Sequence, residues 1–242
     1  MKSWNPALSK STFEGLEAAE ESMTLAGTVN KTAILLAIVL IGAAWVWNIY
    51  LTTKQPESIM TYLWVGTLGG LAFAFITIFF KTASPYTSPI YALLEGFAIG
   101  GISAFYEGQY PGIAIQAVGL TFGTLICMLA AFYTGVIKAT ENFKLGVISA
   151  TGGICVLYLV DLVLMMFGKP ISFIHEGGVM GILFSLFVVV IAALNLVIDF
   201  DFIAQGVANR SPKYMEWYSA FGLVVTLVWL YLEILRLLAK RK

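Results

Sequence analysis

Five carboxylates lie within long apolar stretches of this 242-residue chain, and no other residues are better placed to do chemistry. They are Glu95, Asp161, Asp199, Asp201 and Glu233. A charge at the centre of a membrane helix costs about 2.5–3.5 kcal/mol on insertion scales, so such residues usually face a cavity or a partner. The only base within these stretches is Arg236, at the end of the last one. Acids without matching bases favour a site that takes cations or protons.

Four of these acids have a structural alternative that the sequence leaves open. Asp199 and Asp201 are separated by about 200° around a helix, so at most one of them faces a given pore, and both also fit headgroup-level caps. Glu233 can pair with Arg236, three residues later on the same helix. Glu95, beside a glycine, also fits a neutral acid that is hydrogen-bonded within a tight helix. Asp161 has no evident partner in the sequence and equally fits a water-filled outer vestibule.

The remaining titratable residues argue against an enzyme. The single histidine, His175, falls in a loop and is most simply a solvated side chain. One histidine supports neither a heptahelical zinc hydrolase nor a Ser–His intramembrane protease. Cys127 and Cys155 both lie in apolar runs, which excludes a disulfide framework. The segment 217–236 has no lysine to carry retinal. We expect no catalytic residue and no cofactor.

The composition places these acids in a membrane protein. Hydrophobic residues make up 59% of the chain, charged residues only 12%, and the mean hydropathy is +0.87. The formal net charge is zero, so no basic surface is available for nucleic acid. A bilayer core needs roughly 20 apolar helical residues, and seven segments fit that length. They run near 32–52, 60–80, 89–106, 112–134, 146–167, 179–200 and 217–236. The predicted fold is an all-α integral membrane protein, a seven-helix bundle.

The polar breaks between these segments are too short to hold a further domain. We therefore predict a polar cytoplasmic tail over residues 1–30 and one transmembrane domain over residues 31–242. Ser11 and Glu14 have the spacing of a capping box, which predicts a short surface helix in the tail. Gly96 and Gly100 form a small-xxx-small pair, which predicts close helix packing around the third segment.

Lysine and arginine counts predict the orientation. Eight lie on the N-terminal side, and the opposite loops hold two, Lys54 and Lys169. The eight are Lys2, Lys10, Lys31, Lys81, Lys138, Lys144, Arg210 and Lys213. This bias places the N-terminus in the cytoplasm. The basic C-terminal tail disagrees, because it would lie outside if all seven segments cross. We favour seven full spans over the alternative, in which one segment is re-entrant.

In this orientation the acids form two tiers. Glu95, Asp199 and Asp201 fall toward the cytoplasmic side, whereas Asp161 and Glu233 form an outer tier. Two acidic tiers separated by apolar helix are what a gated cation path requires.

Several motifs together resemble one family. The third segment contains Tyr91-Ala-Leu-Leu-Glu-Gly-Phe-Ala-Ile-Gly-Gly-Ile-Ser103, which is similar to the signature helix of the Bax inhibitor-1 family. The likeness continues through Ala117–Thr121, Asp199–Ile203, Glu216–Tyr218 and Leu230–Arg236. With Asn5-Pro6 in the tail, the chain most resembles the bacterial, YccA-like branch, and the resemblance covers nearly its whole length.

The resemblance implies a bundle with the last helix central. It also implies a pH sensor made of two aspartates, one on the sixth helix and one on the seventh. Asp201 best matches the first, with Asp199 close by. The second aspartate is missing, because Thr226 occupies its place when counted back from Arg236. Asp199 or Glu95 is a candidate substitute.

Two functions follow from the family. The first is a pH-sensitive calcium leak channel gated by protonation of intramembrane carboxylates, with calcium as the transported ion and a candidate site at Asp199, Asp201 and Glu95. Because Thr226 replaces the second aspartate, we expect a leak with weaker or more acid-shifted pH dependence than a two-aspartate member, with Asp201 as the sensor. The second is a non-conducting regulator that restrains a stress-response partner, for which a membrane-bound AAA+ protease is the candidate. Either protein would lie in the inner membrane of a bacterium. The sequence leaves the oligomeric state open.

Overall fold

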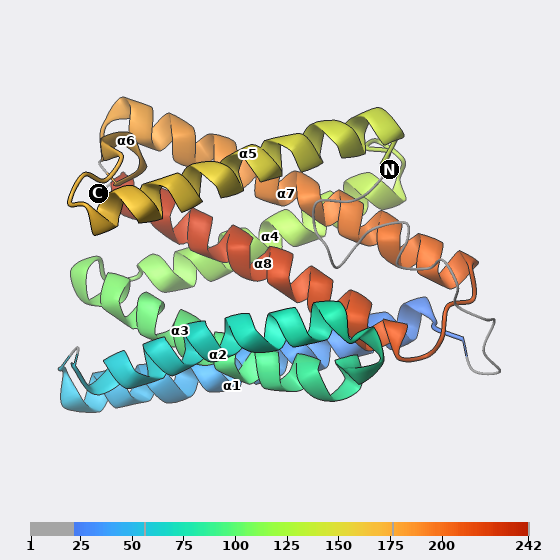
Figure 1. Ribbon diagram of the computed structural model, residues 1–242, viewed down its shortest axis with the longest axis horizontal. Coiled ribbons are helices and arrows are strands. Elements are labelled where there is room, and N and C mark those ends of the chain that lie inside the picture. The colour runs from blue at the N-terminus through green and yellow to red at the C-terminus, as the bar shows by residue number, and fades with distance from the viewer. Residues whose placement is uncertain (1–21, 56, 176, 242) are drawn as a thin grey trace.

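The computed structural model describes residues 22–55, 57–175 and 177–241 (Figure 1). Within them, seven helices are long and apolar enough to cross a membrane, which confirms the predicted class. These are α1 (Leu25–Thr53), α2 (Glu57–Phe79), α3 (Ser84–Gln109), α4 (Ile113–Tyr133), α5 (Glu141–Met166), α7 (Val179–Ala208) and α8 (Met215–Lys240). A 3₁₀ turn, η2 (Lys81–Ala83), and a short helix, α6 (Ser172–His175), complete the order. The predicted Ser11–Glu14 helix and the Asn5-Pro6 motif lie outside the described residues.

Several helices are longer than the sequence predicted, because capped polar turns extend them beyond the apolar segments. The first begins at Leu25 rather than near residue 32, where the Thr24 hydroxyl accepts a hydrogen bond from the Gly27 amide at 2.9 Å. The fifth begins at Glu141 rather than near 146, and Thr140 caps it in the same way. The sixth continues to Ala208, past the predicted end at 200. Polar residues assigned to loops therefore belong to helices.

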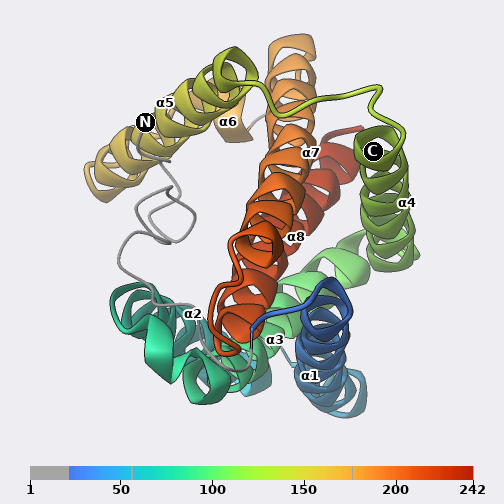
Figure 2. The ribbon, with the colours of Figure 1, turned by 90° about the vertical axis from the view of Figure 1, so that its right-hand side faces the viewer.

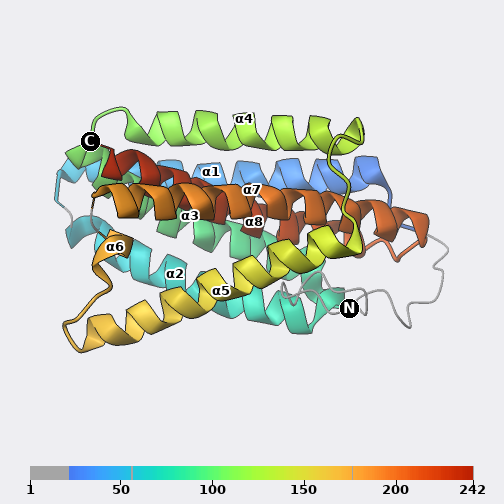
Figure 3. The same cartoon turned by 90° about the horizontal axis from the view of Figure 1, so that it is seen from above.

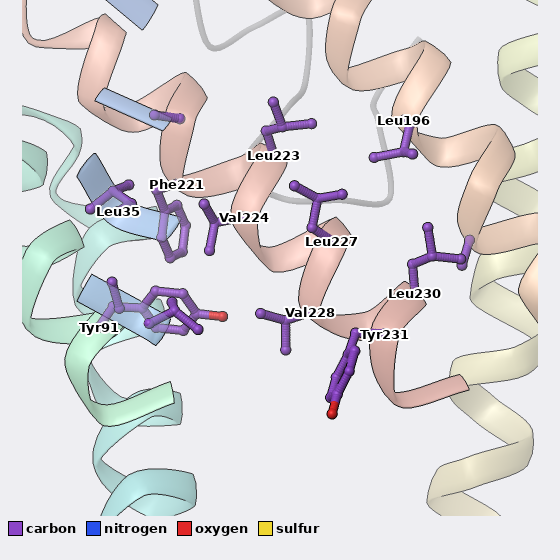
Figure 4. Close-up of a cluster of buried hydrophobic side chains, with 14 of the residues drawn as sticks. Leu35, Tyr91, Leu196, Phe221, Leu223, Val224, Leu227, Val228, Leu230 and Tyr231 are labelled. Carbon is purple, nitrogen blue, oxygen red and sulfur yellow. The ribbon is translucent and has the colours of Figure 1, made fainter. Parts of the chain in front are cut away.

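The last helix lies at the centre of the bundle, as the family resemblance implied. Figure 2 shows α8 surrounded by the other long helices, and it contacts α1, α3, α4 and α7. Of its 26 residues 17 are buried. Figure 4 shows the apolar side chains of α8 pointing outward in several directions, with Val224, Leu227 and Leu230 among them. The rings of Phe221 and Tyr91 of α3 meet edge to face at 4.9 Å, an arrangement that aromatic pairs prefer.

The first three helices pack through glycine, as predicted for Gly96 and Gly100. A β-carbon placed at Gly96 would lie 2.5 Å from the Val39 carbonyl oxygen of α1. One at Gly100 would lie 2.6 Å from the Ala43 carbonyl oxygen. The backbones of α1 and α3 are thus in direct contact, with no room for a side chain between them.

The fifth helix lies on the outside of the bundle and slants across it (Figure 3). Only four of its 26 residues are buried. The start of α1 and the end of α8 lie at opposite ends of the bundle (Figure 1), and the seven long helices all run between those ends. The lengths of the described helices therefore favour seven full spans over the re-entrant alternative.

Candidate functional site

Asp199 of α7 is a deeply buried acid beside the central helix. It is 3% exposed and lies beside Thr226 of α8, which is 4% exposed. The same hydroxyl lies 3.3 Å from the Gly222 carbonyl oxygen of its own helix. Among the described residues, the Oδ2 atom of Asp199 has no hydrogen-bond partner. The central helix thus presents a hydroxyl to a carboxyl group for which no ion pair is observed in the described part of the chain.

Asp201 has different surroundings. Its carboxylate forms an ion pair with Lys144 of α5 at 2.5 Å and accepts a hydrogen bond from Gln205, one turn later on α7. Its side chain is 23% exposed. The two neighbouring aspartates therefore point toward different helices, as their spacing requires, and Asp199 rather than Asp201 faces Thr226.

Glu95 lies between α3 and α2. A β-carbon placed at Gly70 of α2 would be 3.0 Å from its Oε2 atom, so the glycine leaves room for the carboxyl group. Among the described residues, no hydrogen bond or ion pair joins Glu95 to Asp199, Asp201 or Thr226, and no group of three potential metal ligands converges. The three acids named for calcium do not surround one point.

The outer tier contains Glu233, which is 2% exposed and pairs with Arg236 of its own helix at 3.1 Å. The Tyr158 hydroxyl of α5 joins both, since it donates to Glu233 at 3.0 Å and accepts from Arg236 at 2.7 Å. The guanidinium also lies over the Tyr158 ring at 5.2 Å from its centroid, within cation–π distance. Tyr158 thus joins α5 to a charge pair of α8 whose acid is buried and whose base is partly exposed.

The second member of this tier, Asp161, has partners that the sequence did not reveal. One carboxylate oxygen lies 2.7 Å from Nε2 of His175, and the other accepts the Ile171 backbone N–H at 2.8 Å. His175 was expected to be a solvated loop residue. It instead ends α6, which brings its ring back to α5 while its side chain stays 45% exposed.

The expectation that the acids lack basic partners is therefore wrong for Asp201 and Asp161, which pair with Lys144 and His175, respectively. For Glu233 the structure confirms the alternative of a pair with Arg236. Lys144 was assigned to a loop because the polar first turn of α5 lies outside the apolar segment. The two acids without an observed ion pair in the described residues are Asp199 and Glu95.

The sequence analysis noted a further buried acid, Glu216, only as part of a family motif and not as a site residue. It is fully buried at the start of α8, where it accepts from the backbone and hydroxyl of Thr24 at 2.9 and 3.0 Å. Lys213 lies 3.1 Å and Lys31 3.5 Å from its carboxylate oxygens. Gly27 leaves space for this carboxylate, since a β-carbon there would overlap it. The cluster ties the start of α1 to the start of α8.

Two grooves open on the sides of the bundle. One, of about 430 Å³, has an almost wholly apolar lining from α1, α3, α4 and α8. The other, of about 560 Å³, lies between α5, α6 and α8 and is named the outer groove. Its lining combines apolar side chains with polar ones, which are Thr151, Tyr158, Asp161, His175 and Arg236.

The fold and these polar contacts define a class of protein. It is an integral membrane bundle in which polar side chains meet between the helices. Residues 5–242 match the sequence profile of a family described as Bax inhibitor 1 like. The chain belongs to the Bax inhibitor-1 family, as its motifs indicated. No individual curated protein and no solved structure matches it.

Proposed function

We propose that this protein is a cation leak channel of the bacterial inner membrane, with calcium as the transported ion and Asp199 as its proton-sensitive switch. One observation carries the proposal. A buried carboxyl group keeps one oxygen without a hydrogen bond among the described residues. Burying an uncompensated charge is costly, so such a group must hold a proton or accept a passing cation.

The geometry supports Asp199 over Asp201 as the sensor. Asp201 already has a cationic partner in Lys144. Asp199 faces the hydroxyl of Thr226, the position where the family carries its second aspartate. A threonine cannot share a proton with Asp199 as a second carboxylate would, so we expect a weaker or more acid-shifted pH response than in a two-aspartate member.

The lysine and arginine distribution supports a cytoplasmic N-terminus. Single cysteines introduced near Lys138 and near Lys169 test this orientation on intact cells with a membrane-impermeant thiol reagent. Labelling from outside should reach the loop near Lys169 and spare the loop near Lys138. The reverse labelling pattern would contradict the predicted cytoplasmic N-terminus.

The mechanism is tested by calcium flux into dye-loaded liposomes from about pH 5 to about pH 8, with each variant reconstituted at equal density. Asp199→Asn should remove most of the pH dependence, because an amide does not titrate. Asp201→Asn is the matched control two residues away and should keep it. Thr226→Asp should change the profile, since two neighbouring carboxylates can share one proton.

Two results would count against the proposal. If Asp199→Asn keeps the wild-type profile, Asp199 is not the sensor. If the wild-type protein conducts no cation at any pH, the alternative of a non-conducting regulator of a membrane AAA+ protease or another stress-response partner takes its place.

A further inference from the structure

Polar side chains recur every seven residues along one face of α5. They are Lys144, Thr151 and Tyr158. Seven residues make nearly two helical turns, so the three lie in a row. Each bonds to α7 or α8, at 2.5 Å for Lys144, 2.8 Å for Thr151 and 3.0 Å for Tyr158. Their partners are, in order, Asp201, Asn195 and Glu233. A row of polar contacts thus joins α5 to α7 and α8, and we call the interface that contains it the seam.

The polar side chains of the seam are only partly buried. Four of the 26 residues of α5 are buried, whereas α8 is buried over most of its length. Polar groups at membrane depth commonly line water-filled space. The seam is therefore a candidate interface for the entry of water.

One end of the seam is already open. The outer groove reaches Thr151 and Trp229 from the side of Asp161 and His175. Its volume of about 560 Å³ is enough for many water molecules, each of which occupies about 30 Å³ in the liquid. The groove thus has room for water from this side up to Trp229, which is one of its lining residues.

An apolar cluster forms part of the groove wall. Ile154 of α5 and Ile191 of α7 are 4% and 8% exposed and pack together with the ring of Trp229 of α8. Trp229 follows Thr226 by three residues and precedes Glu233 by four, so all three lie on one face of α8. The indole therefore stands between the outer pair and the hydroxyl that faces Asp199.

We propose that the seam is the route by which water and cations reach Asp199, and that Trp229 closes it as an apolar gate together with Ile154 and Ile191. The cation part of this inference rests on the proposed function. Apolar constrictions exclude water and so block ions without a steric seal. Beyond the gate, the route leads past Asp199 toward the Lys144–Asp201 pair at the other end of α5.

Flux measurements test the gate. Trp229→Ala should raise calcium entry into liposomes by about tenfold or more, because removing the indole lets the constriction fill with water. Trp45→Ala is the matched control, since that indole is 62% exposed on the outer surface of α1, and it should leave flux unchanged. Ile154→Ala opens the same constriction from α5 and should also raise flux. Trp229→Phe keeps a ring in place and should stay near wild type.

A labelling experiment reports on the seam without ion flux. In a background with Cys127→Ser and Cys155→Ser, Thr226→Cys places a thiol behind the gate. A membrane-impermeant thiol reagent added on the side of His175 should react with it when Trp229→Ala is present and not when Trp229 is intact. His175→Cys lies in front of the gate and should react in both backgrounds.

The outcomes separate the two proposals. If Trp229→Ala and Ile154→Ala change neither flux nor labelling while the wild-type leak still depends on Asp199, the seam is not the route and the proposed function stands. If Thr226→Cys becomes reactive on removal of the indole but no variant conducts calcium, the water path and its gate stand and the proposed function fails.

Discussion

The helices α3 and α5 are held to the bundle in opposite ways. In α3, Gly96 and Gly100 bring the backbone against that of α1, with no space for a β-carbon at either position. In α5, the glycines Gly146 and Gly153 have nothing within 4 Å of a β-carbon placed on them. Side chains make the contacts instead, through polar bonds such as that of Thr151 and through the apolar packing of Ile154.

This difference shows two solutions to one physical problem. Lipid tails are as apolar as leucine, so helices in a bilayer gain little by hiding apolar side chains from each other. They associate through close backbone packing or through polar bonds. The first interface is dry and leaves no room for change. The second can exchange its bonds with water, which suits an element that borders a path.

The largest effect is expected from filling the backbone contact. Gly96→Ala places a methyl group 2.5 Å from the Val39 carbonyl oxygen and should lower the free energy of unfolding by about 2–3 kcal/mol. The measurement is reversible unfolding in detergent micelles. Gly119→Ala on α4 is the control, because nothing lies within 4 Å of its β-carbon, and it should cause no loss. Equal losses of unfolding free energy in Gly96→Ala and Gly119→Ala would mean that the backbone contact at Gly96 is not what stabilises α3.

A smaller effect is expected from the polar bonds that Tyr158 of α5 makes to α8. Tyr158→Phe removes the hydroxyl that joins Glu233 and Arg236 but keeps the ring. We expect a loss of about 1.5 kcal/mol, near the upper end for single hydrogen bonds between membrane helices, because both partners are charged. Tyr133→Phe is the control, since that residue is 89% exposed. A loss as large as that of Gly96→Ala would mean that the polar ties dominate the assembly.

The smallest effect is expected in the middle of the seam. Thr151→Val removes the hydroxyl that accepts from Asn195 and should cost about 0.6 kcal/mol, the average for such bonds in membranes. Thr121→Val on α4 is the matched control, because the Thr121 hydroxyl donates to the Ala117 carbonyl of its own helix. If Thr121→Val costs as much as Thr151→Val, the loss reflects the shape of the side chain rather than the bond between helices.

The sequence predicted the parts of the fold that are local. Hydropathy located all seven spans, and the glycine spacing in α3 predicted its close packing. The sequence did not predict which residues distant along the chain form ion pairs. The ion pair of Lys144 with Asp201 depends on a polar first turn that hydropathy assigned to a loop. His175 meets Asp161 only because α6 folds back.

The candidate site shows the same limit. The helical angle between Asp199 and Asp201 predicted that one of them at most would face a given pore. Which one does so depends on how α7 is rotated about its axis, and that rotation is set by packing against α8. Glu216 gave no local signal of its burial, because the residues that surround it come from the start of the chain.

The Glu216 cluster has a consequence for how the protein is made. The carboxylate binds Thr24 across 192 positions of sequence, so its partners enter the membrane at the beginning of synthesis and it follows near the end. Until α8 emerges, Thr24 and Lys31 lack this partner, although α1 can already pack against α3 through Gly96 and Gly100. The last helix to be made therefore completes the polar contacts at the start of the first. A ribosome stalled before residue 215 would leave an inserted chain in which this end of α1 still lacks its buried carboxylate.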